Sequence, residues 1–181
     1  MSLTVHRYWT GLRRVPSVSP YARRVALGLG LDVQDWDDAT LPRAVREQVD
    51  ALSGCVPDRW APRHRANVAR LALLHEHGGI WLDHDAMLLR VPDWQPGWVA
   101  WANGRYCTAL MGFEAGDPRL ALALAGVHEA PTTPEASGER MLAGAWADQG
   151  VHRVPLPFGW YGEPETGADL WAVHCWASGP A

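Results

Sequence analysis

The sequence predicts one α/β domain with a mainly parallel central sheet flanked by helices. Three observations support this fold class. The chain has 181 residues, of which 48% are hydrophobic and 20% charged, as is usual for a single soluble globular domain. Short apolar segments alternate with amphipathic helical segments through its first half. Neither an internal repeat nor a low-complexity linker divides the chain, so we expect residues 1–181 to form a single domain.

The first predicted strand, 3–9, is apolar and aromatic and stops at Thr10-Gly11. Ser19-Pro20 predicts the start of a helix, because it offers an N-cap residue followed by proline at the first helical position. A second short strand is expected at 31–36. The amphipathic segment 42–52 predicts the next helix.

Pro62 opens the following helix, which Gly78-Gly79 ends, the first glycine suiting the left-handed position just beyond a helix. The apolar triplet 80–82 is then a short buried strand that runs directly into Asp83 and Asp85. The remaining predicted elements are strands near 87–91, 97–101 and 106–112, helices at 117–127 and 138–148, and closing strands at 151–156 and 170–176.

Composition excludes several functions. The formal net charge of −4 gives no general attraction to nucleic acid or to an anionic membrane. All basic residues are arginines, so Schiff-base chemistry and a Walker A lysine are excluded.

The three cysteines are far apart and odd in number, the start lacks a signal-peptide apolar region, and no apolar run could span a bilayer. We therefore expect a cytoplasmic protein.

Asp83 and Asp85 are the first candidate functional residues. In an extended chain, residues two apart face the same way, so both carboxylates could point at one ion with His84 turned aside. Ligands of open α/β sheets bind beyond the carboxyl ends of strands, where this pair falls. Two carboxylates this close favour a cation between them, and hard oxygen ligands select Mg²⁺ or Mn²⁺. The alternative is a solvated turn.

Asn67 and Arg70 lie three apart on the preceding predicted helix and share one face. If the helix packs beside the strand that it feeds, this face looks toward the aspartates. Arginine would hold a phosphate or a sugar hydroxyl, and an asparagine amide suits sugar hydroxyls. The alternative is a solvated helix surface.

The segment "ANVARLALLHEHGGIWLDHD" resembles the DxD region of retaining GT-A glycosyltransferases. The similarity is to the family 32 type, which includes yeast mannosyltransferases and α-galactosyltransferases, and clostridial glucosylating toxins carry a related stretch. Asn67 stands where that family usually has aspartate. The residues in register with the motif are Arg70, Gly78, Gly79, Trp81, Asp83 and Asp85.

Four further segments resemble the same family. "VHRYWTG" is similar to its opening strand and "LDVQDWDD" to its second strand with trailing acidic residues. "SGERML" is similar to a later Gly-Pro segment, with Glu139 in place of proline. "LWAVHCWASG" is similar to the closing strand, which nominates His174 and, less directly, Trp176 and Ser178.

The resemblance implies a Rossmann-like GT-A fold and a retaining transfer of sugar from a UDP- or GDP-linked donor, with Mn²⁺ or Mg²⁺. Residues 1–102 would be the donor half and 103–181 the acceptor half with the closing strand. The acceptor would be a hydroxyl of a glycan, small molecule or protein, with nucleic acid disfavoured by the acidic charge.

The resemblance also assigns roles to residues. Asp83 would touch ribose and sugar, and Asp85 would ligate the metal with His174 and Asp83. Arg70 and Asn67 would orient the donor sugar beside Gly79. The base would stack on Tyr8 or Trp9.

Two other functions stay open from the sequence. A haloacid-dehalogenase-like phosphohydrolase also runs an apolar strand into Asp-x-Asp, but Met87 occupies its usual Thr/Val position and the chain has no lysine. A non-catalytic module that only binds a nucleotide-sugar would be compatible with Asn67 and the short C-terminus.

Overall fold

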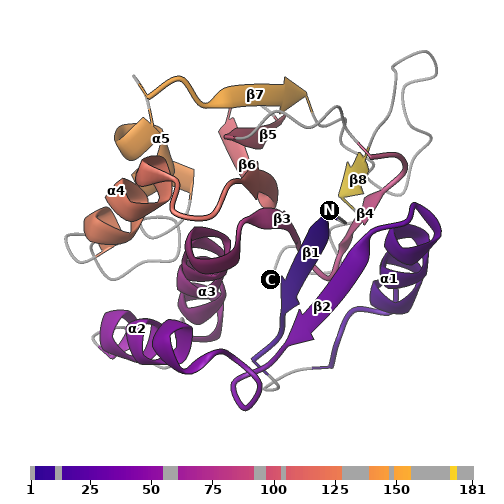
Figure 1. Cartoon of the computed structure of the whole chain (residues 1–181), viewed down its shortest axis with the longest axis horizontal. Helices are drawn as coiled ribbons and strands as arrows, with labels where there is room; N and C mark the ends of the chain where they lie inside the picture. Colours follow the sequence, from indigo (N-terminus) through magenta and orange to yellow (C-terminus); the bar gives the residue numbers. More distant parts are fainter. Residues whose placement is uncertain are drawn as a thin grey trace.

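The protein has a six-stranded central sheet with strand order β2-β1-β3-β6-β5-β7 and a separate two-stranded sheet, β4-β8 (Figure 1). The structure is a computed structural model, and it describes residues 3–10, 14–54, 61–91, 97–102, 105–127, 139–146, 149–155 and 172–174. The strands are β1 Thr4–Tyr8, β2 Asp32–Trp36, β3 Gly79–Leu82, β4 Ala86–Leu88, β5 Trp98–Ala102, β6 Arg105–Phe113, β7 His152–Pro155 and β8 Ala172–His174. The helices are α1 Ser19–Gly28, α2 Arg43–Ser53, α3 Ala61–His77, α4 Pro118–Val127 and α5 Glu139–Trp146.

Five strands of the central sheet run in one direction and β6 alone runs in the other. β1 pairs in parallel with β2 and β3, β6 is antiparallel to both β3 and β5, and β7 is parallel to β5. The predicted α/β class with a mainly parallel sheet is therefore confirmed. Each predicted helix and strand is also present, with ends shifted by a few residues.

Helices cover both faces of the β1–β2–β3 part of the sheet. α3 packs on β1 and β3 and is followed outward by α2 and α4, whereas α1 packs on β2 and β4 (Figure 1). Side chains alternate between these faces as strand geometry requires. On β3, Trp81 joins the core under α2, α3 and α4, whereas Ile80 and Leu82 join the core that also holds Val5 and Val33.

The junction between α3 and β3 depends on two glycines. Gly78 has φ +66° and Gly79 φ +102°, a region that L-residues with a side chain rarely adopt. A Cβ added to Gly79 would lie 2.4 Å from the carbonyl oxygen of Thr4. The glycine pair thus lets the chain leave the helix and enter the sheet directly against β1.

His6 is the buried histidine at this junction. Its Nε2–H donates to the Gly78 carbonyl at 3.0 Å, and its Nδ1 accepts from the indole N–H of Trp36 at 3.1 Å. Burial lowers the pKa of His6 to about 4. The neutral imidazole therefore ties β1, β2 and the end of α3 together.

Among the residues that the structure describes, no helix is long and apolar enough to cross a membrane.

Candidate functional site

Asp83 and Asp85 lie just past the carboxyl end of β3, a central strand between β1 and β6. The backbone N–H of Asp83 donates to the carbonyl of Ala109 on β6 at 2.8 Å, which holds the start of the segment in the sheet. The carboxyl ends of β1 and β2 lie at the same edge, because those strands are parallel to β3. The site thus lies beyond the carboxyl ends of the parallel strands, where ligands of α/β proteins bind.

The extended conformation that the sequence analysis assumed for residues 83–85 is wrong. The backbone N–H of Ala86 donates to the carbonyl of Asp83 at 3.0 Å, so the four residues form a turn. The turn forms because the chain leaves the central sheet after Leu82 and enters the small sheet at Ala86. At this corner His84 is buried, whereas Asp83 and Asp85 are half-buried.

Arg70 and Trp81 hold the carboxylate of Asp83. The indole N–H of Trp81 donates to Oδ1 of Asp83 at 2.5 Å, and Nη2 of Arg70 lies 3.4 Å from the same oxygen. The guanidinium also stacks over the Trp81 ring, 5.3 Å from its centroid. Nη1 of Arg70 donates to the Thr108 carbonyl at 2.8 Å and to the Thr108 hydroxyl. Arg70 therefore bridges α3, β6 and the aspartate turn.

The helix face that carries Asn67 and Arg70 is buried, and Arg70 reaches the aspartate turn from it. The two residues are 8% and 7% exposed, and Arg70 forms its ion pair with Asp83. The solvated-helix alternative for these two residues is therefore wrong. A buried guanidinium needs compensation, and its hydrogen bonds to Thr108 and its charge pairing with Asp83 supply it.

The small sheet brings the C-terminal strand to the aspartate turn. β4 and β8 pair antiparallel, with Ala86 opposite His174 in register. Because Ala86 directly follows Asp85, the backbone of His174 lies beside the turn although 89 positions separate it from Asp85 (174 minus 85). Trp176 and Ser178 lie outside the described residues.

Tyr8 and Trp9 have different surroundings. Tyr8 is 3% exposed, and its hydroxyl donates to Asp38 at 2.5 Å, while Arg65 holds the same carboxylate at 2.8 Å. Burial and the neighbouring Asp38 raise the pKa of Tyr8. A ring buried in this way offers no face for stacking in this structure. Trp9 is half-buried and follows β1, so it is the better candidate of the two.

Sequence reasoning missed a buried polar cluster behind the aspartate turn, made by Arg7, Ser19 and His84. Arg7 is 1% exposed and donates to the Ser19 hydroxyl, and its Nη2 lies 2.9 Å from Nδ1 of His84. Burial, with the charge of Arg7, lowers the pKa of His84 to about 4. The signal available in the sequence was a charged residue, Arg7, inside a strand whose last four residues are all buried, "TVHRY".

The residues at the turn fit a hard divalent cation. Two carboxylates with half-buried side chains flank the corner, and Mg²⁺ or Mn²⁺ in such sites commonly takes one or two protein carboxylates together with substrate phosphates. Within the described part of the chain no three histidine, cysteine, aspartate or glutamate side chains gather as a metal cage. The site thus fits a cation that substrate oxygens help to hold.

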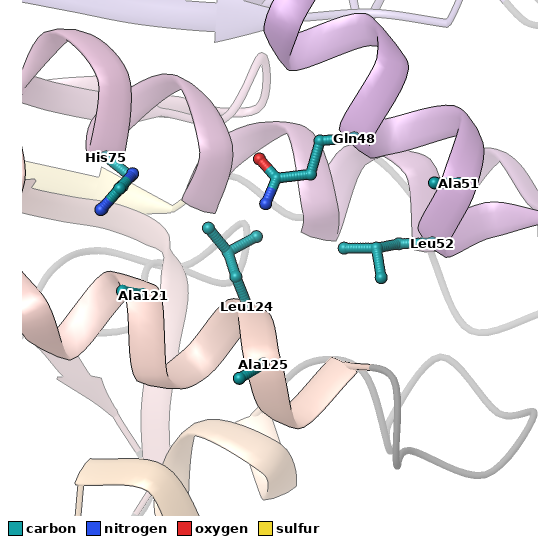
Figure 2. A pocket seen from close by; sticks show the side chains of 7 residues that line it. All are labelled: Gln48, Ala51, Leu52, His75, Ala121, Leu124 and Ala125. Carbon is teal, nitrogen blue, oxygen red and sulfur yellow. The ribbon is translucent and has the colours of Figure 1, made fainter.

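A separate cavity of about 260 Å³ lies between α2, α3 and α4 (Figure 2). It is lined mainly by apolar side chains, with Gln48 and His75 as its polar members. None of the predicted site residues lines it, so it is distinct from the aspartate turn. Its lining residues are Gln48, Ala51, Leu52, His75, Ala121, Leu124 and Ala125.

Comparisons with known proteins agree with the geometry. Residues 31–99 match the family model described as "Glycosyltransferase sugar-binding region containing DXD motif". The solved structure named "PaToxG Glycosyltransferase" superposes with a TM-score of 0.64 at 10% identity, covering 82% of this chain and 69% of that one. No curated protein matches the sequence.

A second solved structure, described as a glycosyltransferase involved in the glycosylation of the major capsid of PBCV-1, has a TM-score of 0.50 at 10% identity. It covers 96% of this chain and 93% of that one. At such low identity these likenesses establish the fold.

Residues 31–99 thus match the DXD-containing sugar-binding region of glycosyltransferases, and the chain has the GT-A-like fold of the two solved glycosyltransferases. The resemblance to DXD glycosyltransferases is thus confirmed, and the more specific assignment to family 32 stays a prediction.

Proposed function

We propose that the protein is a metal-dependent, retaining glycosyltransferase that moves a sugar from a UDP- or GDP-linked donor to an acceptor hydroxyl. The observation that carries the proposal is the pairing of buried Arg70 with Asp83 at the aspartate turn, inside the region that matches the DXD family model. A buried arginine fixed on the first aspartate is suited to hold an anionic or hydroxyl-rich substrate at that point.

The surrounding side chains bind different parts of the donor. Asp83 accepts hydrogen bonds from sugar or ribose hydroxyls, using the carboxylate face that Trp81 and Arg70 leave open. Arg70 and Asn67, which lie on one face of α3, orient the donor sugar. Trp9 stacks on the base at the end of β1.

Asp85, with Asp83 and His174, would hold Mn²⁺ or Mg²⁺ against the diphosphate. Such a cation neutralises the charge that develops on the leaving nucleoside diphosphate. The pairing of Ala86 with His174 supports this assignment, since it brings the closing strand beside the turn.

The stereochemistry follows from the resemblance. An α-linked donor is expected to yield an α-linked product, with the leaving phosphate accepting the proton of the acceptor hydroxyl. NMR of the product's anomeric proton tests this directly, because a β-linked product would rule out retention.

The binding part of the proposal is tested by titration calorimetry of UDP and GDP into the protein, with and without Mn²⁺. One nucleotide is expected to bind only when the metal is present. Asp85→Asn, which keeps the size of the side chain and removes its charge, is expected to abolish that binding. Asp32→Asn on β2 is the matched control, because Asp32 is exposed at the sheet edge.

If neither nucleotide binds with Mn²⁺ present, the donor assignment is wrong. If a nucleotide binds but no nucleotide-sugar is turned over, even by hydrolysis, the protein is a binding module instead of an enzyme. Release of UDP or GDP from a panel of nucleotide-sugars measures this turnover.

A further inference from the structure

His84 is unusual for the corner of a turn. Corner residues are commonly exposed, yet His84 is 9% exposed and lies between the two aspartates of the DxD motif. Its Nδ1 atom lies 2.9 Å from Nη2 of Arg7 and 2.8 Å from the hydroxyl oxygen of Ser19. The ring is therefore held from one side by α1 and β1.

This environment determines which nitrogen of His84 carries the proton. A guanidinium can only donate, so Nδ1 must accept from Arg7, and the proton of the neutral ring is on Nε2. Nε2 is buried and has no hydrogen-bond partner within the described structure. A buried N–H without any partner destabilises the folded protein, so a neighbouring group is expected to interact with it.

Within the described residues, Trp9 is an aromatic neighbour of His84. The two ring centroids are 5.4 Å apart and the planes meet at 64°, a T-shaped arrangement in which the edge of one ring meets the face of the other. An N–H directed at an aromatic face is a recognised weak hydrogen bond. The backbone of Trp9 is fixed independently, because its N–H donates to the Trp36 carbonyl at 3.0 Å.

We propose that His84 is a positioning residue whose Nε2–H points at the face of Trp9 and holds that ring in place for the nucleotide base. Arg7 and Ser19 fix the tautomer and the orientation of His84, His84 fixes Trp9, and Trp9 presents its other face to the base. The inference rests on the proposed function, in which Trp9 stacks on the donor nucleotide.

Two amide variants separate the two nitrogens of the imidazole. His84→Asn keeps an acceptor where Nδ1 accepts from Arg7 and Ser19, and it removes the Nε2 edge. His84→Gln places an amide N–H near the position of Nε2. A role confined to holding the turn would be preserved by asparagine, whereas a role toward Trp9 would be preserved better by glutamine.

The experiment measures dissociation constants for UDP, GDP and inorganic pyrophosphate, each with Mn²⁺, by calorimetry. The proteins are the wild type, His84→Asn, His84→Gln, Trp9→Ala and the double variant Trp9→Ala with His84→Asn. His152→Asn on exposed β7 is the control. Thermal unfolding of each variant verifies that it is folded.

For the nucleotide that binds, His84→Asn is expected to raise the dissociation constant by roughly five- to tenfold, as the loss of one aromatic contact would. Pyrophosphate binding should stay within about twofold, because pyrophosphate has no base to stack. His84→Gln should recover part of the loss, and in the Trp9→Ala background the asparagine substitution should have no further effect.

The inference is overturned if His84→Asn weakens pyrophosphate binding as much as nucleotide binding. It is also overturned if His84→Asn weakens nucleotide binding equally in the wild type and in the Trp9→Ala background. If the wild type binds pyrophosphate and nucleotides equally well, Trp9 makes no base contact. This inference and the stacking role of Trp9 are then overturned, while metal-dependent binding of a diphosphate stands. If the wild type binds none of the three with Mn²⁺, the proposed function itself fails.

Discussion

The indole N–H of Trp81 donates to the carboxylate of Asp83 two residues further along the chain, at 2.5 Å. Trp81 is 1% exposed and belongs to the core under α2 and α3, whereas Asp83 is half-buried at the aspartate turn. A core residue of β3 thus orients the first carboxylate of the motif. Arg70, stacked over the same indole ring, holds that carboxylate from α3.

Trp81→Phe keeps a large aromatic ring in the core and removes the indole N–H. We expect it to lower the free energy of unfolding by about 1–2 kcal/mol, because a partly buried carboxylate loses a hydrogen bond. We also expect it to weaken donor binding several-fold. Urea unfolding and calorimetry measure the two effects. Trp101→Phe is the control, since the contacts described for Trp101 involve its ring, and equal losses in both variants would contradict the prediction.

Arg70→Lys retains the charge but cannot reach Thr108 and Asp83 together as a guanidinium does. We expect kcat/KM for the donor to fall by about 10- to 100-fold, equivalent to ~1.4–2.7 kcal/mol of transition-state stabilisation. Nucleotide release from the donor is the measurement, with thermal unfolding recorded beside it because Arg70 is buried. Arg63→Lys, on an exposed position of the same helix, should change neither quantity.

Gly79→Ala tests whether the junction between α3 and β3 requires glycine at position 79. Its φ of +102° and the 2.4 Å approach to the Thr4 carbonyl together predict a loss of at least about 2 kcal/mol in the free energy of unfolding. Gly28→Ala is the matched control, because a Cβ there meets nothing within 4 Å at the end of α1. That control should be neutral or stabilising by up to about 1 kcal/mol. Chemical denaturation of both variants checks the prediction, and a Gly79 variant as stable as the wild type would contradict it.

The pKa of His6 predicts how the free energy of unfolding depends on pH. Its pKa falls to about 4 in the folded protein from 6.5 in the unfolded chain, so between these values the unfolded state binds a proton that the native state does not. The free energy of unfolding should therefore rise with pH through this window, by about 1.4 kcal/mol per pH unit for this one group, and level off above it.

Denaturant unfolding between pH 4 and 7 measures that slope. His6→Gln removes the titrating group, so its slope should be smaller by about one proton. An unchanged slope would show that His6 is protonated in the folded protein.

Much of the fold was predictable because local signals agree with it. α1 begins at Ser19 beside Pro20, and Gly78-Gly79 ends α3, where a left-handed backbone leaves few alternatives. The predicted N-cap role of Ser19 is wrong, because Val18 is the N-cap residue and the Ser19 hydroxyl contacts Arg7 and His84 instead. Short apolar segments predicted the strands, and amphipathic patterns predicted the helices between them. These features depend on neighbours a few residues away, so a single sequence contains the information.

The antiparallel direction of β6 and the small sheet β4-β8 were not predictable in the same way, because strand pairing depends on residues distant in sequence. The same holds for the turn at Asp83 to Ala86, which exists because β4 leaves the central sheet.

The sequence by itself determined the motif of the candidate site. It places an arginine on a helix and then, in order, two glycines, a tryptophan and two aspartates at the strand that follows. Tertiary structure alone decided which other side chains lie near these residues. Packing buried Tyr8 and left Trp9 half-buried, brought His174 beside the turn, and placed Arg7 behind His84. The physical reason is that burial and hydrogen-bond partners arise from contacts between segments far apart in the chain, which residue spacing along one segment does not encode.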